Sequence, residues 1–260
     1  MAYETLHIAS DGSGVMVLTL NRPEKRNALS ATMIAELTDF AKEMAKNPTA
    51  RAIILRGEGS VFCAGGDLGW MHDQIKADRA TRIVEARKLA MMFNALNEMP
   101  VPLIAEIHGA AMGGGVGLAC VCDVVIAADT ATFGLTETRL GLIPATIGPY
   151  VVARLGEGAT RRVFMSARRF DAAEARALGL VADVVPEAEL SARAMQEAAP
   201  YLKVAPRAVG AAKAMARKLG APITTEIIDA SIVALADTWE GDEAAEGIAA
   251  FLEKRAPLWD

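Results

Sequence analysis

The sequence predicts an α/β protein that ends in a helical region. Short apolar runs alternate with helix-like segments through roughly the first two-thirds of the 260 residues, and this alternation is the pattern of an α/β domain. After Pro186 the chain becomes rich in alanine and takes on helical periodicity. Hydrophobic residues make up 52% of the chain and charged residues 23%, which is enough apolar material for a large core.

Four short runs of apolar and β-branched residues predict buried strands. They are Val15 to Leu20, Ala52 to Leu55, Leu103 to Ile107 and Val124 to Ala127. The first run stops at Asn21-Arg22-Pro23, and glycines follow the second, as expected where a strand ends in a turn.

Helices are predicted between and after these strands. Ser30 can cap a helix whose apolar positions Met33, Leu37, Phe40 and Met44 follow helical spacing and which ends before Pro48. A second helix is expected over 80–98. In the last third, proline and glycine separate four more predicted helices, at 187–199, 205–219, 222–238 and 242–255.

Charge and cysteine content exclude several functional classes. The net charge is −5 and no dense run of Lys and Arg occurs, which argues against a nucleic-acid or membrane-surface partner. The three cysteines are an odd number in a long chain and are expected to be reduced thiols. The start of the chain lacks the basic and apolar stretches of a signal peptide. We therefore expect a cytoplasmic protein.

The familiar signatures of metal and nucleotide sites are missing from the sequence. His7, His72 and His108 are scattered, and no Cys-x-x-Cys pair occurs, so no metal site is expected. The sequence also lacks a phosphate-binding P-loop, a dinucleotide glycine fingerprint and a Gly-x-Ser-x-Gly elbow.

Two glycine clusters remain as candidates for chemistry. One is Phe62-Cys63-Ala64-Gly65-Gly66-Asp67-Leu68, and the other is Gly113-Gly114-Gly115, before a short helical run from Val116 to Val121. Either cluster alone could be an ordinary tight turn. Together they could expose two backbone N–H groups, and such groups converging on one point form an oxyanion hole.

Six motifs, in order along the chain, make the sequence similar to the crotonase (enoyl-CoA hydratase/isomerase) family. They are Asn21-Arg22-Pro23-Glu24-Lys25-Arg26-Asn27-Ala28-Leu29-Ser30; Phe62 to Leu68; Gly113-Gly114-Gly115 with Leu118-Ala119 and Cys122-Asp123; Phe133-Gly134-Leu135-Thr136-Glu137 with Gly141-Leu142-Ile143-Pro144; Glu174-Ala175 with Leu178-Gly179-Leu180-Val181; and Glu246-Gly247-Ile248 with Phe251-Leu252-Glu253-Lys254-Arg255. The resemblance covers residues 15 to 256.

The resemblance implies a crotonase-type spiral of repeated ββα units over residues 1–198 and a C-terminal helical trimerisation region over 199–260. It also implies an acyl-CoA substrate, no separate cofactor because coenzyme A is part of that substrate, and a homotrimer or a dimer of trimers. The implied oxyanion donors are the N–H groups of Gly66 and Gly114, and the implied catalytic acid/base is Glu137.

Residues implied to contact coenzyme A or substrate come from three segments. They are Lys25, Arg26 and Ala28 in the first motif; Ala64, Gly65, Asp67 and Leu68 in the second; and Phe251 and Lys254 in the last, approaching the adenine end from a neighbouring subunit. A solvated surface pair is the plain alternative for Lys25 and Arg26, and pairing with phosphates is the functional one.

The sequence departs from the two-glutamate pattern of many hydratases of this family. Gly117 stands where the first glutamate is expected, so Glu137 is the only carboxylate that matches. A single glutamate is also compatible with an enoyl-CoA isomerase, in which one carboxylate moves a proton between two carbons. The stretches around Trp70 and from Phe133 to Tyr150 nevertheless resemble bacterial methylglutaconyl-CoA and isohexenylglutaconyl-CoA hydratases.

We therefore expect a hydratase for a branched or carboxylated enoyl-CoA. The alternatives are an isomerase and, in another class, an RNA-binding or inactive acyl-CoA-binding homologue. A distal carboxylate on the substrate requires a cation or several donors, and Arg139, His72 and Tyr150 are candidates because they lie near the motifs.

Overall fold

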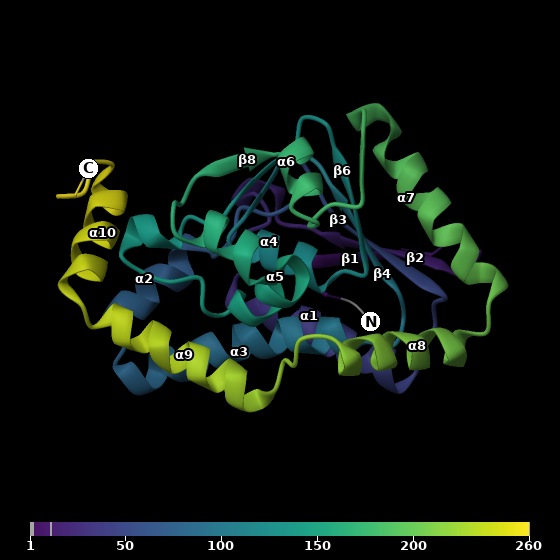
Figure 1. The fold of residues 1–260 in the computed structure, drawn as a ribbon, viewed down its shortest axis with the longest axis horizontal. Helices are drawn as coiled ribbons and strands as arrows, with labels where there is room; N and C mark the ends of the chain where they lie inside the picture. The colour runs from purple at the N-terminus through teal and green to yellow at the C-terminus, as the bar shows by residue number, and fades with distance from the viewer. Residues whose placement is uncertain (1–2, 11, 260) are drawn as a thin grey trace.

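The computed structural model describes residues 3–10 and 12–259, so the outermost ends of the two predicted domains, residues 1, 2 and 260, lie outside it. Its centre is a six-stranded sheet in the order β1-β2-β3-β4-β6-β9 (Figure 1). Every neighbouring pair is parallel except β1 and β2. The strands are β1 Leu6–Ser10, β2 Val15–Leu20, β3 Ala52–Gly57, β4 Leu103–Ile107, β6 Val124–Ala128 and β9 Asp183–Val185.

A smaller sheet stands beside the large one. It pairs β5 (Ala110–Met112) in parallel with β7 (Thr132–Gly134), and β7 antiparallel with β8 (Arg169–Asp171). The chain visits the two sheets in turn, since β4 and β6 belong to the large sheet and β5 and β7 to the small one. Each of these strand pairs is followed by a helix, so the predicted ββα repeat and the α/β class are confirmed.

The four predicted strands and all predicted helices are present. Ser30 caps the first helix as expected, since its Oγ accepts a hydrogen bond from Met33 N at 3.2 Å. The predicted helices are α1 Ala31–Lys46, α3 Arg79–Glu98, α4 Gly114–Val121, α7 Leu190–Ala198, α8 Pro206–Leu219, α9 Thr225–Trp239 and α10 Asp242–Glu253.

Several elements were not predicted from the sequence. The strand β1 carries only one fully buried residue, Leu6, and so lacks a clear apolar pattern. The other unpredicted elements are the short strands β5, β7, β8 and β9, the helices α2 Leu68–Lys76, α5 Gly148–Phe164 and α6 Ala172–Ala177, and the 3-10 helices η1 Pro23–Lys25, η2 Glu137–Leu140, η3 Glu187–Glu189 and η4 Ala199–Lys203.

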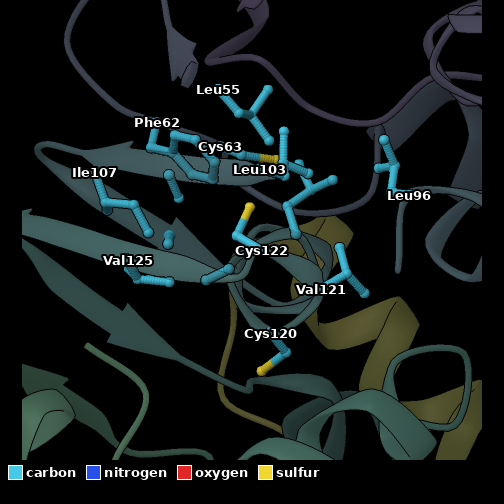
Figure 2. Packing of buried hydrophobic residues seen from close by; sticks show 14 of the residues in the cluster. Leu55, Phe62, Cys63, Leu96, Leu103, Ile107, Cys120, Val121, Cys122 and Val125 are labelled. Carbon is cyan, nitrogen blue, oxygen red and sulfur yellow. The ribbon is translucent and has the colours of Figure 1, made fainter. Parts of the chain in front are cut away.

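The helix α4 runs through the core between the sheets and the outer helices. Figure 2 shows Cys122, just after α4, pointing toward Cys63 and Leu103, whereas Cys120 points to the opposite side of the helix. All three cysteines are free and buried, and burial raises the pKa of the Cys63 and Cys120 thiols to about 12. They therefore pack as small apolar side chains.

The last three helices lie along the outside of the core and contact it in different ways. α8 contains no buried residue, but Lys213 binds Asp123 at 2.8 Å, an ion pair that ties this helix to the end of α4. α9 packs on α3, and α10 packs on η2. Figure 1 shows α8 and α10 at opposite ends of the molecule. In the described part of the chain, no helix has both the length and the apolar character needed to cross a bilayer.

Candidate active site

The first glycine cluster follows β3 and is held by a short parallel bridge to Leu29. Leu29 N donates to Gly65 O at 2.8 Å, and Leu29 O accepts from Asp67 N at 3.2 Å. Leu29 thus bonds to the carbonyl of Gly65 and the N–H of Asp67, the residues on either side of Gly66. Along an extended strand neighbouring residues point their backbone groups in opposite directions, so the N–H of Gly66 points away from Leu29. No described residue accepts a hydrogen bond from it.

The second glycine cluster begins α4. Gly113 has φ +47° and donates its N–H to Gly134 O at 2.8 Å, which fixes the start of the helix. Gly114 is the first helical residue, and the first N–H groups of a helix have no partner within it. The Gly114 N–H is thus a second available donor, in the positive end of the helix dipole.

The two clusters lie directly against each other. Cys63 pairs with the strand that precedes Gly113, donating to Ala110 O at 3.1 Å and accepting from Met112 N at 3.0 Å. A methyl group on Gly65 would lie only 2.9 Å from Met112 O and 3.7 Å from Gly114 N. Gly65 also has φ +97°, so glycine is required there. This close approach brings the free N–H groups of Gly66 and Gly114 to the same region.

Glu137 lies beside these donors. It begins η2, and a methyl group on Gly113 would be 3.0 Å from Glu137 Oε1. Glu137 Oε2 is buried, and no described residue donates to it. Burial raises the pKa of this carboxyl to about 7, against a smaller lowering by its own backbone N–H. A carboxyl that titrates near neutral pH is suited to both taking and returning a proton.

Gly117 has no room for a second carboxylate. A methyl group at this position would lie 2.4 Å from Ile147 Cγ2 and 2.9 Å from Phe93 Cζ. Both of these side chains are buried. The space expected for a first glutamate is therefore occupied by an apolar side chain from the turn before α5.

The closing helix α10 fits tightly on the turn that carries Glu137. A methyl group on Gly247 would lie 2.6 Å from the carbonyl carbon of Leu140, and one on Gly141 would lie 2.4 Å from that of Glu243. Leu142, Ala244 and Ile248 form a small buried apolar cluster across this contact. α10 thus forms part of the enclosure of Glu137.

The structure brings the first two motifs together, as the predicted coenzyme A contacts require. Ala64 N donates to Arg26 O at 3.0 Å. The side chains of Lys25, Arg26 and Ala64 are exposed, whereas Ala28 is buried and offers mainly its backbone, whose carbonyl accepts from Arg22 Nη1 at 2.8 Å.

Asp67 has a structural role that the sequence did not reveal. It caps α2 by accepting from Gly69 N, and it binds Arg22 Nη1 at 2.9 Å. Although burial opposes ionisation, the Arg22 guanidinium and the capping N–H groups hold the pKa of Asp67 below its ordinary value. Its neighbour Leu68 is 56% exposed and free to contact a ligand.

Phe251 and Lys254 lie exposed at the end of α10. The opposite face of this helix packs on η2 of the same chain. Their predicted approach to the adenine end from a neighbouring subunit stays a prediction.

One of the three candidates for binding a distal carboxylate is wrong. Tyr150 is buried, and its hydroxyl donates to Ala90 O at 2.7 Å, so it is a core residue. His72 and Arg139 are exposed.

Sequence reasoning also missed Leu29 and Asn27, which organise the first loop. Asn27 is buried with φ +53° and donates from Nδ2 to Glu58 O and Val61 O. Both residues belong to the first motif, but apart from an asparagine next to a turn nothing in the sequence indicated this role.

Comparisons with known proteins agree with this geometry. The family model described as enoyl-CoA hydratase/isomerase matches residues 10–260. A Mycobacterium tuberculosis protein named "Probable enoyl-CoA hydratase echA8" is 35% identical over 258 residues, covering 99% of this chain and 98% of that protein. The mitochondrial methylglutaconyl-CoA hydratase of Mus musculus is 32% identical over 260 residues, covering 97% of this chain and 82% of the mouse protein.

Solved structures show the same similarity in three dimensions. An enoyl-CoA hydratase from Mycobacterium avium superposes with a TM-score of 0.84 at 30% identity, covering 98% of this chain and 99% of the other. An enoyl-CoA hydratase/isomerase from Marinobacter aquaeolei gives a TM-score of 0.78 at 38% identity, with 98% of each chain covered.

Proposed function

The chain belongs to the enoyl-CoA hydratase/isomerase family, and from that premise we propose that it adds water across the α,β double bond of an enoyl-CoA thioester. The acyl group that we favour is branched or carries a distal carboxylate. The similarity to the mouse methylglutaconyl-CoA hydratase supports this choice.

The proposed reaction uses the two backbone donors and one carboxylate. The thioester oxygen accepts hydrogen bonds from the N–H groups of Gly66 and Gly114, which stabilise the negative charge that develops there. Ionised Glu137 takes a proton from water while the water oxygen bonds to the β carbon. Glu137 then returns that proton to the α carbon of the enolate, so the carboxylate is regenerated and the net change is the addition of one water.

The observation that carries this proposal is the environment of Glu137. Its Oε2 is buried with no described donor, while its Oε1 lies against Gly113, next to the free N–H of Gly114. Leaving a buried carboxylate oxygen without a partner is costly for stability. A function that needs a reactive carboxylate beside an oxyanion hole accounts for this cost.

The test is an assay of hydration with crotonyl-CoA and methylglutaconyl-CoA as substrates. Hydration is monitored as the loss of the absorbance of the conjugated enoyl group. We expect Glu137→Gln to lower kcat by about 10²- to 10⁴-fold, the usual contribution of a general acid/base. Glu157→Gln, a change of the same kind at an exposed site of α5, is the control and should keep full activity. Full activity of Glu137→Gln on every substrate used by the native protein would overturn the proposal.

Double-bond isomerisation is the second candidate, and the surroundings of Gly117 favour it. Because Ile147 and Phe93 fill the space beside Gly117, one carboxylate must perform all proton transfers, as an isomerase requires. Appearance of conjugated absorbance from a 3-enoyl-CoA, faster than its loss from a 2-enoyl-CoA, would select this alternative.

Coenzyme A and subunit contacts complete the proposal. We propose that Lys25 and Arg26 approach the phosphates, that Ala64, Gly65, Asp67 and Leu68 line the pantetheine path, and that residues 199–260 join subunits into a trimer or a dimer of trimers. The exposed apolar side chains of Met215 and Leu219 on α8 support a subunit contact in that region.

A further inference from the structure

The helix α2 is attached to the protein by an unusual inner face. Its only buried residue is polar, Gln74, which is 5% exposed. Trp70 lies one helical turn earlier, so both side chains occupy the same face of α2. Helices normally bury apolar side chains against the core, so this face suggests a purpose other than packing.

A small cavity lies between this face and two neighbouring helices. Its volume is about 10 Å³, and its lining includes Trp70 and Gln74 of α2, Arg82 of α3, and Leu235 and Trp239 of α9. This is close to the space that one water molecule or one oxygen atom occupies.

Two polar atoms at this cavity have no partner among the described residues. Trp70 Nε1, a donor, and Gln74 Oε1, an acceptor, are both buried and unpaired. The oxygen and nitrogen of a glutamine side chain exchange places when its amide turns over, so Gln74 can present either a donor or an acceptor. With the amide turned, the residues that line the cavity therefore include two unpaired donors, Trp70 Nε1 and the Gln74 side-chain nitrogen.

Arg82 adds a positive charge at the same place. Its Nε donates to Gln74 O at 2.8 Å and its Nη2 to Ile75 O at 3.1 Å, while its guanidinium lies 5.1 Å from the ring centre of Trp239. Within the described ranges, no carboxylate lies at ion-pair distance from Arg82, although other arginines of the same helix, such as Arg87, have such partners. The guanidinium is held in position by these carbonyls, and the nearby Asp78 carboxylate interacts with it only beyond ion-pair distance.

The cavity adjoins the reaction site on two sides. Met71, next to Trp70, has its side chain 3.9 Å from where a methyl group on Gly66 would be. On the other side, Leu235 and Trp239 pack against the buried cluster of Leu142, Ala244 and Ile248, and Leu140, from the same turn as Glu137, packs against that cluster too. The beginning of α2 thus lies beside Gly66, and the cavity lies further along the same helix.

We propose that the cavity is the subsite for a carboxylate at the far end of a short acyl chain. One carboxylate oxygen enters it, accepts hydrogen bonds from Trp70 Nε1 and the turned amide of Gln74, and is compensated by Arg82. This inference rests on the proposed acyl-CoA function and specifies its substrate class. The proposed subsite uses none of the candidates from the sequence, since Arg139, His72 and Tyr150 do not line this cavity.

Equilibrium binding tests the subsite separately from catalysis. Calorimetry compares glutaryl-CoA, which ends in a carboxylate, with valeryl-CoA, which has the same chain length and no charge. Neither has a double bond to hydrate. We expect the native protein to bind glutaryl-CoA roughly tenfold tighter or more, because a charged hydrogen-bonded pair is gained.

Two variants and one control complete the test. Trp70→Phe removes the N–H and keeps a ring, and Arg82→Met removes the charge; each should reduce the preference for glutaryl-CoA about fivefold or more. Arg87→Met removes a charge from the exposed face of the same helix and should leave the preference unchanged. Equal binding of the two ligands by the native protein, or an unchanged preference in both Trp70→Phe and Arg82→Met, overturns the subsite. If the native protein prefers glutaryl-CoA but hydrates no enoyl-CoA, the proposed function is overturned and the subsite is not.

Discussion

The two sides of the candidate site are built on different principles. The loop side, which we propose binds the thioester oxygen, consists of two glycine loops that are joined by backbone hydrogen bonds, with Gly65 and Gly113 in conformations that favour glycine. The helix side, where we propose that the acyl group binds, consists of side chains on α2, α3 and α9, and α2 buries only Gln74. One side is fixed by the backbone, whereas the other is formed by side chains that substitution can change.

This difference separates chemistry from specificity. Catalysis requires donors whose positions do not change during the reaction, and backbone N–H groups in a bonded loop meet that requirement. Selection among acyl groups requires only that some side chains differ between relatives. We therefore expect changes on the loop side to affect every substrate, and changes on the helix side to affect substrates unequally.

Among changes confined to one of the two sides, the largest effect is predicted for removing one donor on the loop side. Gly66→Pro eliminates an N–H and should lower kcat by about 10²- to 10³-fold on all substrates. Gly66→Ala keeps the N–H, and its methyl group has room because the nearest atom is 3.9 Å away, so its kcat should stay within a few-fold of the native value. Steady-state kinetics measure kcat for the two variants, and circular dichroism confirms that both are folded. Equal losses in both variants would contradict the role of the N–H.

The second prediction concerns stability, and it links the two sides through Glu137. The fold raises the pKa of this carboxyl from 4.5 to about 7, so the folded protein favours the protonated form. Stability is therefore lost as the pH rises from about 4.5 to about 7. The Glu137→Gln variant lacks this titration. At 1.36 kcal/mol per pKa unit, its unfolding free energy minus that of the native protein should therefore rise by about 3 kcal/mol from pH 4 to pH 8. Urea denaturation at the two pH values measures this difference, and a gain that does not change with pH would show that the pKa is ordinary.

A smaller effect is expected from loosening α10. Gly247→Val places a branched side chain where even a methyl group would lie 2.6 Å from Leu140, so α10 should move away from η2. Water would then reach Glu137 and lower its pKa, which shifts the rising limb of the pH–rate profile to lower pH, and kcat should fall about tenfold. Gly158→Ala, at an open position of α5, is the control. An unshifted pH profile in Gly247→Val would mean that α10 does not shield Glu137.

The smallest effect is predicted for the exposed ion pairs of the helix side. Arg79 at the start of α3 binds Asp237 at 2.6 Å and Glu240 at 3.0 Å near the end of α9, and all three side chains are at least 36% exposed. Solvent and salt screen such pairs, so Arg79→Gln should leave the midpoint of thermal unfolding almost unchanged. Thermal unfolding at low and high salt checks this, and a larger change would mean that the pair holds α9 in place.

Local sequence patterns predicted the loop side well. Strands, caps and glycines depend on neighbouring residues, so β2, β4 and the Ser30 cap were correct to the residue. The motif order also identified which glycines and which glutamate to examine. The structure places the segments of Gly66, Gly114 and Glu137 against one another, while their catalytic roles stay predictions.

The helix side was much less predictable, for physical reasons. The residues that line the cavity are distant in sequence, from Trp70 to Trp239, and no local pattern indicates that they meet. α2 has only nine residues and begins directly after the glycine cluster, and its existence was not predicted. Tyr150 was misjudged because its role depends on a hydrogen bond to Ala90, on another helix.

The position of α10 has a consequence for how the protein is made. Synthesis proceeds from the N-terminus, so the turn with Glu137 leaves the ribosome long before the helix that covers it. Until Gly247 reaches Leu140, we expect that carboxyl to be open to water, with a pKa closer to that of an ordinary glutamate. The two glycine loops precede Glu137 in the chain and can therefore come together before α10 is made, whereas the full burial of Glu137 has to wait for α10.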